Sequence, residues 1–484
     1  MSQSPFVKKV VKGTFWLTFG SVMAKGLTAL AYLVLARILT VNAYGEYGMV
    51  KSTIDNFLIF ATMGVGLTAT KYISELKDEN KQKASSILGA SIVAVTLLSS
   101  VVFLVLILFS NSLATSVLGN EALRLPLILA GGVLLFISVN GVVGGALLGL
   151  QSYRSMSVIN SVQGVLLFVF LCLGGYFYGM VGAVAGNLVA MILMCLISWY
   201  ILRSTLKEIG MKISLKNLKE SLRSIYKFAI PASLGMLVVA PTIWILNTML
   251  VNTPDGYTQL GVYTAVLIFS LAIRTVNGSL SNALLPIFLS KDMEITPKKE
   301  FFNYHGAWIL CLLISIPFII FPEIATYILG AKYPEQDVIL ILELSIITTF
   351  LISFKQGIHR DLIKKNRMWL SVLSTGIFAS TAIIVFLLLK DYGALGFAIS
   401  FLAGYFMNTV LVIPLFVYLK VTPKNTFRSF WILLVVGLVG LLAYNAIYTQ
   451  LIILRSLVSL IGLVLLLFCV YKFYKKMISL KVSE

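Results

Sequence analysis

Charged residues are scarce in this chain. Only 12% of its 484 residues are Asp, Glu, Lys or Arg, whereas a soluble protein carries about 25%. Hydrophobic residues make up 59%, and apolar runs of about 18 residues or more recur from end to end, which is typical of transmembrane helices. The composition excludes an ordinary soluble domain and predicts an all-α polytopic membrane protein.

Metal-binding and disulfide patterns are also missing. The four cysteines, Cys172, Cys195, Cys311 and Cys469, all fall inside apolar runs without ligand-like spacing. They are typical of small buried side chains. The sequence contains no G-x-x-x-x-G-K-[ST] phosphate-binding loop, so direct ATP hydrolysis is not expected. We therefore expect neither a cofactor nor a metal ion.

Polar or Gly/Pro-rich turns divide the chain into about fourteen apolar windows, each long enough to span a bilayer. Their approximate limits are 12–38, 46–73, 84–109, 122–150, 155–177, 181–203, 227–251, 258–290, 302–321, 337–360, 367–389, 394–419, 427–447 and 452–474. Every second connection is rich in Lys and Arg, and the others carry little beyond Arg124, Lys332 and Lys390. By the positive-inside rule, the basic connections and both termini lie in the cytoplasm of a multi-pass cell-membrane protein. This asymmetry accounts for most of the formal net charge of +19, so no nucleic-acid partner is expected.

A basic segment, 204–226, joins the sixth window to the seventh. Around it, between Lys212 and Phe228, apolar residues recur on one helical face and lysines on the other. The apolar residues are Ile213, Leu215, Leu218, Leu222 and Ile225. This pattern predicts an amphipathic helix on the membrane surface, with a solvated linker helix as the alternative.

Three short sequences recur in order in the second half of the chain, each at an outward turn. Tyr44-Gly45-Glu46-Tyr47-Gly48 corresponds to 257–261, Val117-Leu118-Gly119 to 328–330, and Tyr178-Gly179-Met180-Val181-Gly182 to 392–396. A six-helix repeat gives both copies the same orientation, with the transport path between them. The sequence thus predicts one lobe in 1–203, the linker 204–226, a second lobe in 227–420 and two further helices in 421–484, with the two lobes around a central cavity.

Three cations interrupt helices that should be apolar: Lys25, Lys51 and Arg274. A charge at bilayer depth costs several kcal/mol, so it normally faces an aqueous cavity or a partner. Interior basic groups therefore indicate an anionic cargo, and the planar guanidinium of arginine suits phosphate better than the point charge of lysine does.

Polar side chains accompany each cation on the same helical face. They are Thr18, Ser21 and Thr28 with Lys25, Asp55 with Lys51, and Ser270 and Asn277 with Arg274. We expect this set to line the cavity. Two ion pairs are the alternatives: Lys51 with Asp55 one turn away, and Arg274 with Glu343. Glu343, and also Asp55, could instead couple transport to a cation.

The stretch Ala36-Arg37-Ile38-Leu39-Thr40, leading into Tyr44-Gly45-Glu46-Tyr47-Gly48, resembles the end of the first helix in polysaccharide flippases of the multidrug/oligosaccharidyl-lipid/polysaccharide exporter superfamily. The span count, the repeat and the extra terminal helices also match. The resemblance implies a flippase, not an enzyme, that moves prenyl-diphosphate-linked oligosaccharide from the inner to the outer leaflet by alternating access of its lobes. It also implies that cations on the first, second and eighth helices line the cavity.

The implied partners are the lipid-linked oligosaccharide, the membrane lipids, and the polymerase and glycosyltransferases of polysaccharide biosynthesis. Three other functions compete with this one. A multidrug or cation antiporter of the same superfamily favours acidic cavity residues, and a lipid II flippase would share the basic ones. An oligosaccharide polymerase or glycosyltransferase would need a large outer loop or an outward acidic pair, and Glu46 stands nearly alone.

Overall fold

The computed structural model describes residues 5–233, 236–289, 297–365, 367, 369–423, 427, 429–448 and 452–479. Within them all regular structure is helical, as the sequence predicts. The chain divides into two compact units, Met1–Gly261 and Val262–Glu484. We call these unit 1 and unit 2.

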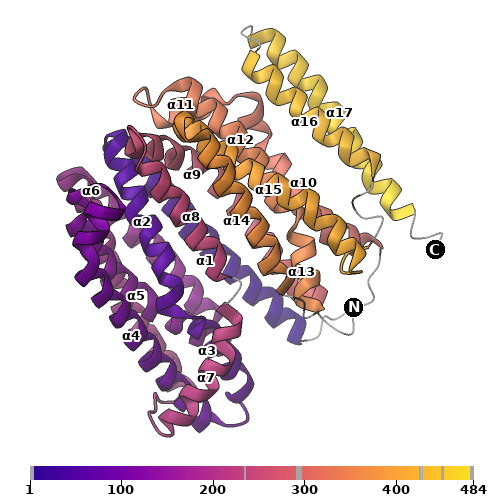
Figure 1. Cartoon of the computed structure of the whole chain (residues 1–484). Helices are drawn as coiled ribbons and strands as arrows, with labels where there is room; N and C mark the ends of the chain where they lie inside the picture. The colour runs from indigo at the N-terminus through magenta and orange to yellow at the C-terminus, as the bar shows by residue number, and fades with distance from the viewer. Residues whose placement is uncertain are drawn as a thin grey trace. The chain divides into compact units, whose positions relative to one another are not determined.

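Helices pack side by side in unit 1, most of them long and apolar (Figure 1). They are α1 (Pro5–Ile38), α2 (Val41–Thr62), α3 (Val65–Leu76), α4 (Lys81–Ser112), α5 (Arg124–Gly149), α6 (Tyr153–Ile209), α7 (Leu218–Ser233) and α8 (Met236–Val251), followed by the first turn of α9 (Gly256–Leu289). Helix α8 begins the predicted second lobe, but Trp244 and Asn247 donate hydrogen bonds to Thr53 and Ser52 of α2. This packing accounts for its place in unit 1.

Unit 2 continues with the rest of α9 and the remaining helices. These are α10 (Pro297–Ile320), α11 (Glu323–Leu329), α12 (Glu335–Phe354), α13 (Gln356–Lys364), α14 (Trp369–Leu389), α15 (Gly393–Tyr418), α16 (Phe430–Tyr448) and α17 (Ile452–Ser479). The last two form a hairpin that packs against α10 (Figure 1). Arg455 of α17 holds the carboxylate of Glu323 through two nitrogens, at 2.5 and 3.1 Å, which fixes this hairpin to α11.

In the described part of the chain, nine helices are long and apolar enough to cross a membrane, or ten if the bent pair α2–α3 is a single span. The predicted second window, 46–73, contains this bend of 44°, which falls at Met63 and Gly64, both with positive φ. The membrane-spanning all-α class is confirmed, and the count of about fourteen spans stays a prediction.

Two of the nine helical segments contain a sharp reversal. The 57 residues of α6 include Tyr178 (φ −132°) and Gly179 (φ 60°), and the segment of α14 and α15 turns at Tyr392 (φ −88°) and Gly393 (φ 52°). A positive φ strains any residue with a Cβ, so glycine suits each turn. Tyr178-Gly179 and Tyr392-Gly393 are one of the predicted repeat pairs, and their shared backbone form supports the repeat.

A second repeat pair, Tyr44–Gly48 and Tyr257–Gly261, forms a contact that we call the outer crossing. A Cβ on Gly45 would lie 1.8 Å from the carbonyl oxygen of Tyr257, and one on Gly261 would lie 2.0 Å from that of Val41. Only glycine allows two backbones to approach this closely. Because α2 and α9 come from different predicted repeats, the outer crossing joins the two repeats on the predicted outward side.

Two hydrogen bonds reinforce the outer crossing. The Tyr257 hydroxyl donates to the carbonyl oxygen of Leu118 at 2.6 Å, and the Asn252 amide donates to that of Val117 at 2.9 Å. Both acceptors belong to the predicted outward turn after α4. The first turn of α9 and the end of α8 are therefore fastened to the first repeat.

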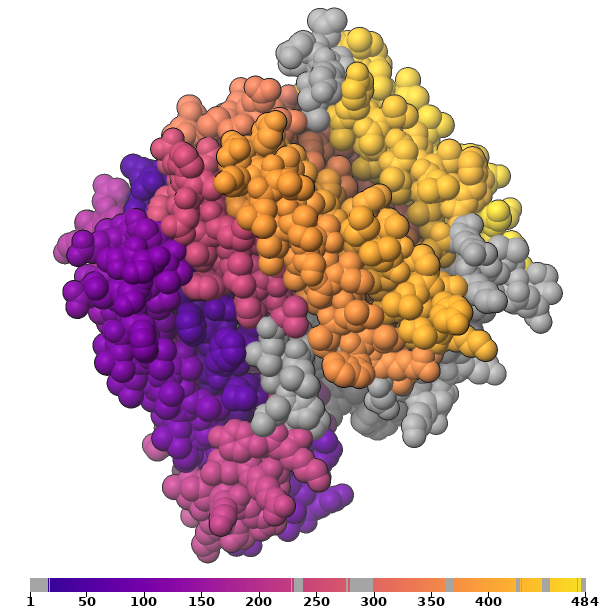
Figure 2. All heavy atoms as spheres, viewed as in Figure 1, coloured from indigo at the N-terminus to yellow at the C-terminus, as the bar shows by residue number. Residues whose placement is uncertain are grey.

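The predicted amphipathic segment forms an extended stretch followed by α7. Its apolar side chains, including Leu218, Leu222 and Ile225, pack into a core shared with α3, α4 and α5. The backbone of Ser214 also donates to the carbonyl oxygen of Ser85 at 3.2 Å. The apolar face is thus covered by protein, not by the membrane surface as predicted, although Leu215 stays exposed. Figure 2 shows α7 forming the surface at one end of unit 1.

Candidate functional site

Lys25 lies on α1, on a face turned away from α6. Other residues of α1 pack tightly against α6: a Cβ on Gly164 would lie 2.8 Å from the Cα of Ala24. Lys25 is exposed and makes no ion pair or hydrogen bond within the described residues. A cation within an apolar span without a protein carboxylate nearby is available to an external anion.

The polar side chains beside Lys25 are half-buried: Thr18, Ser21 and Thr28. Thr28 donates its hydroxyl proton to the carbonyl oxygen of Ala24 at 2.8 Å, so it presents only acceptor lone pairs to a ligand. One turn further on, Tyr32 approaches Tyr47 of α2, with ring centroids 6.3 Å apart. The stripe on α1 therefore leads to the polar residues of α2.

Lys51 and Asp55 form the first of the two predicted ion pairs, with the Lys51 ammonium 2.6 Å from the carboxylate. Their side chains are 34% and 56% exposed, and the ammonium also lies 6.0 Å from the centroid of the Tyr32 ring. The structure therefore shows Lys51 in an ion pair with Asp55, which is the alternative to a free cation in the cavity. A partly exposed ion pair of this kind is weak, so Lys51 can release Asp55 and bind another anion instead.

Arg274 does not form the predicted pair with Glu343. Its guanidinium donates from Nε to the Thr349 hydroxyl at 3.3 Å, and no carboxylate of the described chain lies within 4.0 Å of it. Arg274 is half-buried and lies near the phenol groups of Tyr263 and Tyr405. The arginine is therefore surrounded by neutral hydrogen-bonding groups.

Ser270 and Asn277, the other members of the α9 stripe, have no exposed surface. The Asn277 amide donates to the Ser353 hydroxyl of α12 at 2.8 Å, one turn beyond Thr349. In this structure neither side chain opens onto a water-filled space, and the stripe instead packs against the hydroxyl groups of α12. The pattern on α9 was read from spacing alone, which cannot tell a packed polar interface from a cavity wall.

Glu343 is also buried, with 4% of its surface exposed. Its Oε1 accepts no hydrogen bond, and it forms no ion pair within the described residues. An unpaired carboxylate in an apolar span is costly to ionise, so it is either protonated or compensated by a cation. The predicted pairing of Glu343 with a base is thus not seen within the described residues.

Lys355 is a site residue that the sequence analysis missed, because it was grouped with the basic residues of a predicted cytoplasmic connection. It caps α12, donates to the side-chain oxygen of Asn408 on α15, and lies 5.2 Å from the centroid of the Tyr405 ring. No carboxylate of the described residues lies within 4.0 Å. Its position inside the predicted membrane-spanning window 337–360 could have indicated that Lys355 is an interior cation.

Arg274 of α9 and Lys355 of α12 thus both lie near Tyr405 of α15. Arg274 and Lys355 of unit 2 have no carboxylate of the described chain within 4.0 Å, and neither has Lys25 of unit 1, whereas Lys51 of unit 1 is paired with Asp55. We call Arg274, Lys355 and Tyr405 the unit 2 cluster.

The fold defines the class of protein. It matches "Lipid II flippase MurJ, inward closed conformation" with a TM-score of 0.69, covering 96% of this chain and 99% of that one at 15% identity. It also matches a transporter of the MOP superfamily from Pyrococcus furiosus, with a TM-score of 0.58, 17% identity and coverage of 86% and 97%. Identities this low show the fold alone, which this chain shares with these transporters.

The sequence places the chain more narrowly: it belongs to the polysaccharide biosynthesis protein family, whose model matches residues 10–291. A relative, the EPS I polysaccharide export inner membrane protein EpsE of Ralstonia solanacearum, is 26% identical over 325 residues, covering 65% of this chain and 72% of that protein. EpsE of Ralstonia nicotianae is 25% identical over 285 residues, with coverage of 57% and 62%. The resemblance to polysaccharide flippases is confirmed, and these relatives are membrane transport proteins, not known enzymes.

Proposed function

We propose that the protein is a flippase that moves prenyl-diphosphate-linked oligosaccharide from the inner to the outer leaflet for cell-surface polysaccharide biosynthesis. The observation that carries the proposal is the uncompensated interior charge of Lys25 and of the unit 2 cluster. A cation held within an apolar span is stabilised by an anion, and a diphosphate offers two adjacent phosphoryl groups. Family membership supplies the polysaccharide context.

The mechanism we propose is alternating access with both termini in the cytoplasm. The diphosphate engages Lys25 and Arg274, the glycan occupies the polar cavity, and the prenyl tail stays in lipid. The predicted cavity roles of Thr18, Ser21 and Thr28 belong to the same proposal. Ser270 and Asn277 are fully buried here, so they can line the cavity only in a state in which α9 has moved away from α12. Opening to the outside then requires the outer crossing to separate, because it joins the two repeats on that side.

The competing function of a cation antiporter is less well supported. Such a transporter uses free acidic groups for its cargo, but Asp55 is already paired with Lys51 at 2.6 Å. Glu343 is free of a partner within the described residues, and we assign it to ion coupling. A polysaccharide polymerase and glycosyltransferases are the proposed functional partners, and we propose no nucleic-acid partner.

Flipping by the purified protein in proteoliposomes tests the proposal. Lys25→Ala and Arg274→Ala should each lower the flipping rate of a prenyl-diphosphate-linked glycan by roughly tenfold to a hundredfold, because hydrogen bonds to charged groups contribute about 1.5–3 kcal/mol. Arg274→Lys should be milder. Lys390→Ala, which removes an exposed charge outside the cavity, is the control.

Wild-type flipping by both alanine variants would refute the role of the cations. Lipid II offered as a second cargo distinguishes a lipid II flippase, and extrusion of cationic drugs by cells that express the wild type distinguishes an antiporter. Drug extrusion without flipping would refute the proposed function as a whole.

A further inference from the structure

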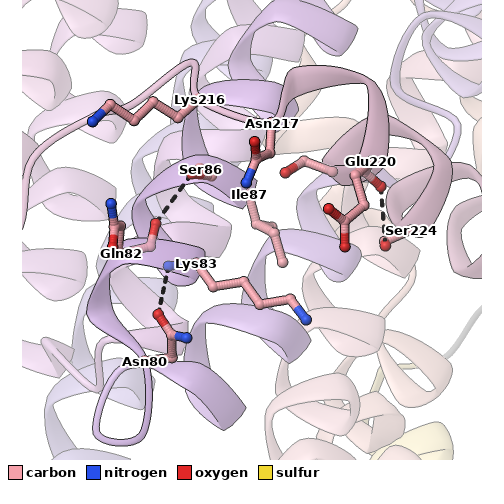
Figure 3. Close-up of a pocket in the computed structure, with 10 residues that line it drawn as sticks. Asn80, Gln82, Lys83, Ser86, Ile87, Lys216, Asn217, Glu220 and Ser224 are labelled. Atoms are coloured by element: carbon pink, nitrogen blue, oxygen red, sulfur yellow. Dashed lines mark hydrogen bonds between the residues drawn. The ribbon is translucent and has the colours of Figure 1, made fainter.

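A cavity of about 400 Å³ lies in unit 1, and no residue of the polar stripes lines it (Figure 3). It is bounded by the first turns of α4, the last residues of the linker and the first turns of α7. Its lining includes Lys83, Ser86, Asn217, Glu220, Ser221 and Ser224. The volume is within the range of small-molecule sites, and the cavity lies on the side predicted to be cytoplasmic.

Two helix N-termini meet at this cavity. Helix α4 starts at Lys81, after Asn80, whose side chain accepts a hydrogen bond from the backbone of Lys83 at 2.9 Å. Helix α7 starts at Leu218, after Asn217 with φ 54°. The first backbone N–H groups of a helix lack intrahelical acceptors and carry the positive end of its dipole. Two such ends beside one cavity favour an anion.

An unpartnered hydroxyl group points to the same conclusion independently. Ser221 is 6% exposed and lines the cavity, yet its hydroxyl makes no hydrogen bond within the described residues. Its neighbours differ: Ser86 donates to the carbonyl oxygen of Gln82 and Ser224 to that of Glu220, each at 3.1 Å. The Ser221 oxygen is not among the fully buried polar atoms, so it is accessible from the cavity that Ser221 lines and can donate to a ligand there.

The charged groups of the lining complete the site. Figure 3 shows the Lys83 side chain reaching from α4 toward Glu220 and Ser224. Lys83 forms no ion pair within the described residues, so its charge is available. Lys216 also belongs to the lining, but Figure 3 shows its ammonium group turned away from Lys83 and Glu220.

We propose that this cavity binds a phosphate group. A phosphate oxygen can accept from the Lys83 ammonium, another from the Ser221 hydroxyl, and the rest from the free N–H groups of the two helix ends. The source is either a soluble phosphate ester or the headgroup of an anionic lipid. Binding would tie α7 to α4, and α7 is the segment that joins the two predicted lobes.

Titration calorimetry of the full chain in a non-ionic detergent tests this site with inorganic phosphate and with glucose 1-phosphate, at constant ionic strength. Lys83→Gln and Ser221→Ala should each weaken binding by about tenfold or more, since each removes a donor to the phosphate. Glu220→Gln should tighten binding by removing a repulsive charge. Lys219→Gln, on the same helix but outside the lining, should leave binding unchanged.

Nanodiscs distinguish the two sources. If only a lipid supplies the phosphate, phosphatidylglycerol but not phosphatidylcholine should slow hydrogen exchange at the amides of α7, and Lys83→Gln should abolish the effect. Binding of either soluble phosphate would assign the site to a solute. Absence of both effects overturns the proposal, as does an equal loss in Lys219→Gln, which would show a diffuse basic surface.

Discussion

The outer crossing gives the sharpest test of how this protein opens. In Gly45→Ala, the new Cβ would lie 1.8 Å from the carbonyl oxygen of Tyr257. That oxygen belongs to backbone, so it cannot turn away like a flexible side chain. The two helices must separate by about 1 Å or more before ordinary van der Waals contact is restored. The closed outer crossing is therefore destabilised, whereas a separated one is not.

Overpacking of this kind costs about 1–3 kcal/mol. Because about 1.4 kcal/mol is a tenfold change in an equilibrium constant, the ratio of outward-open to outward-closed molecules should rise by roughly fivefold to a hundredfold. Gly261→Ala should act in the same direction, since its Cβ would lie 2.0 Å from the carbonyl oxygen of Val41. A population locked outward-open should flip its cargo more slowly.

Double electron–electron resonance measures this separation as the distance between two spin labels. The labels are placed at Glu121 and Pro254, which are both exposed on predicted outward turns. The native cysteines are first replaced by serine. Gly141→Ala is the control, because its Cβ would meet nothing within 4 Å. Unchanged distance distributions and unchanged flipping in both crossing variants would refute the outer crossing as a gate. A shift that Gly141→Ala shares would show only general loosening.

Three further predictions concern ionic groups. Glu323→Gln should destabilise the docking of α16 and α17 by about 1–3 kcal/mol, because buried Arg455 loses its bidentate partner, and thermal unfolding of the purified protein measures this. A double-mutant cycle that removes Lys51, Asp55 or both should give a coupling free energy of only about 0.2–1 kcal/mol, because the pair is partly exposed. A much larger coupling free energy would contradict the conclusion that the pair is weak. Glu343→Gln should make flipping insensitive to an imposed ion gradient, and retained sensitivity would remove Glu343 from coupling.

The helical framework could be predicted from hydropathy because a span needs a minimum length of apolar residues. The predicted windows 12–38, 84–109 and 394–419 end within a few residues of the C-termini of α1, α4 and α15. The bend in 46–73 could not be predicted in this way. Hydropathy averages over a window, whereas the bend depends on the positive φ of two residues, Met63 and Gly64.

The partners of the interior charges were harder to predict. The pair between Lys51 and Asp55 follows from one turn of a single helix, so spacing suffices. Arg274 and Glu343 lie on different helices, and whether they meet depends on how α9 and α12 are rotated against each other. This rotation cannot be predicted from spacing within one helix. In the structure Arg274 donates a hydrogen bond to Thr349 instead.

Amphipathicity has the same limit. The spacing of Leu218, Leu222 and Ile225 correctly indicates one apolar face. The pattern does not indicate whether protein or membrane covers that face. Here helices α3, α4 and α5 cover it, which leaves a polar cavity between α4 and α7 where a membrane surface was expected. Lys355 shows the converse error, because its position at the end of a window concealed its contact with Asn408.

The distribution of these charges implies an order of events in transport. The cations of the unit 2 cluster have no carboxylate to release, so an arriving diphosphate displaces only neutral hydrogen-bonding groups such as Thr349 and Asn408. Lys51 must first give up Asp55, at a cost that exposure keeps to about 1 kcal/mol or less. Lys25, which also has no partner within the described residues, and the unit 2 cluster should therefore provide the initial hold on the cargo. Lys51 is suited to join them later, when the exchange of one anion for another can follow the movement of the lobes.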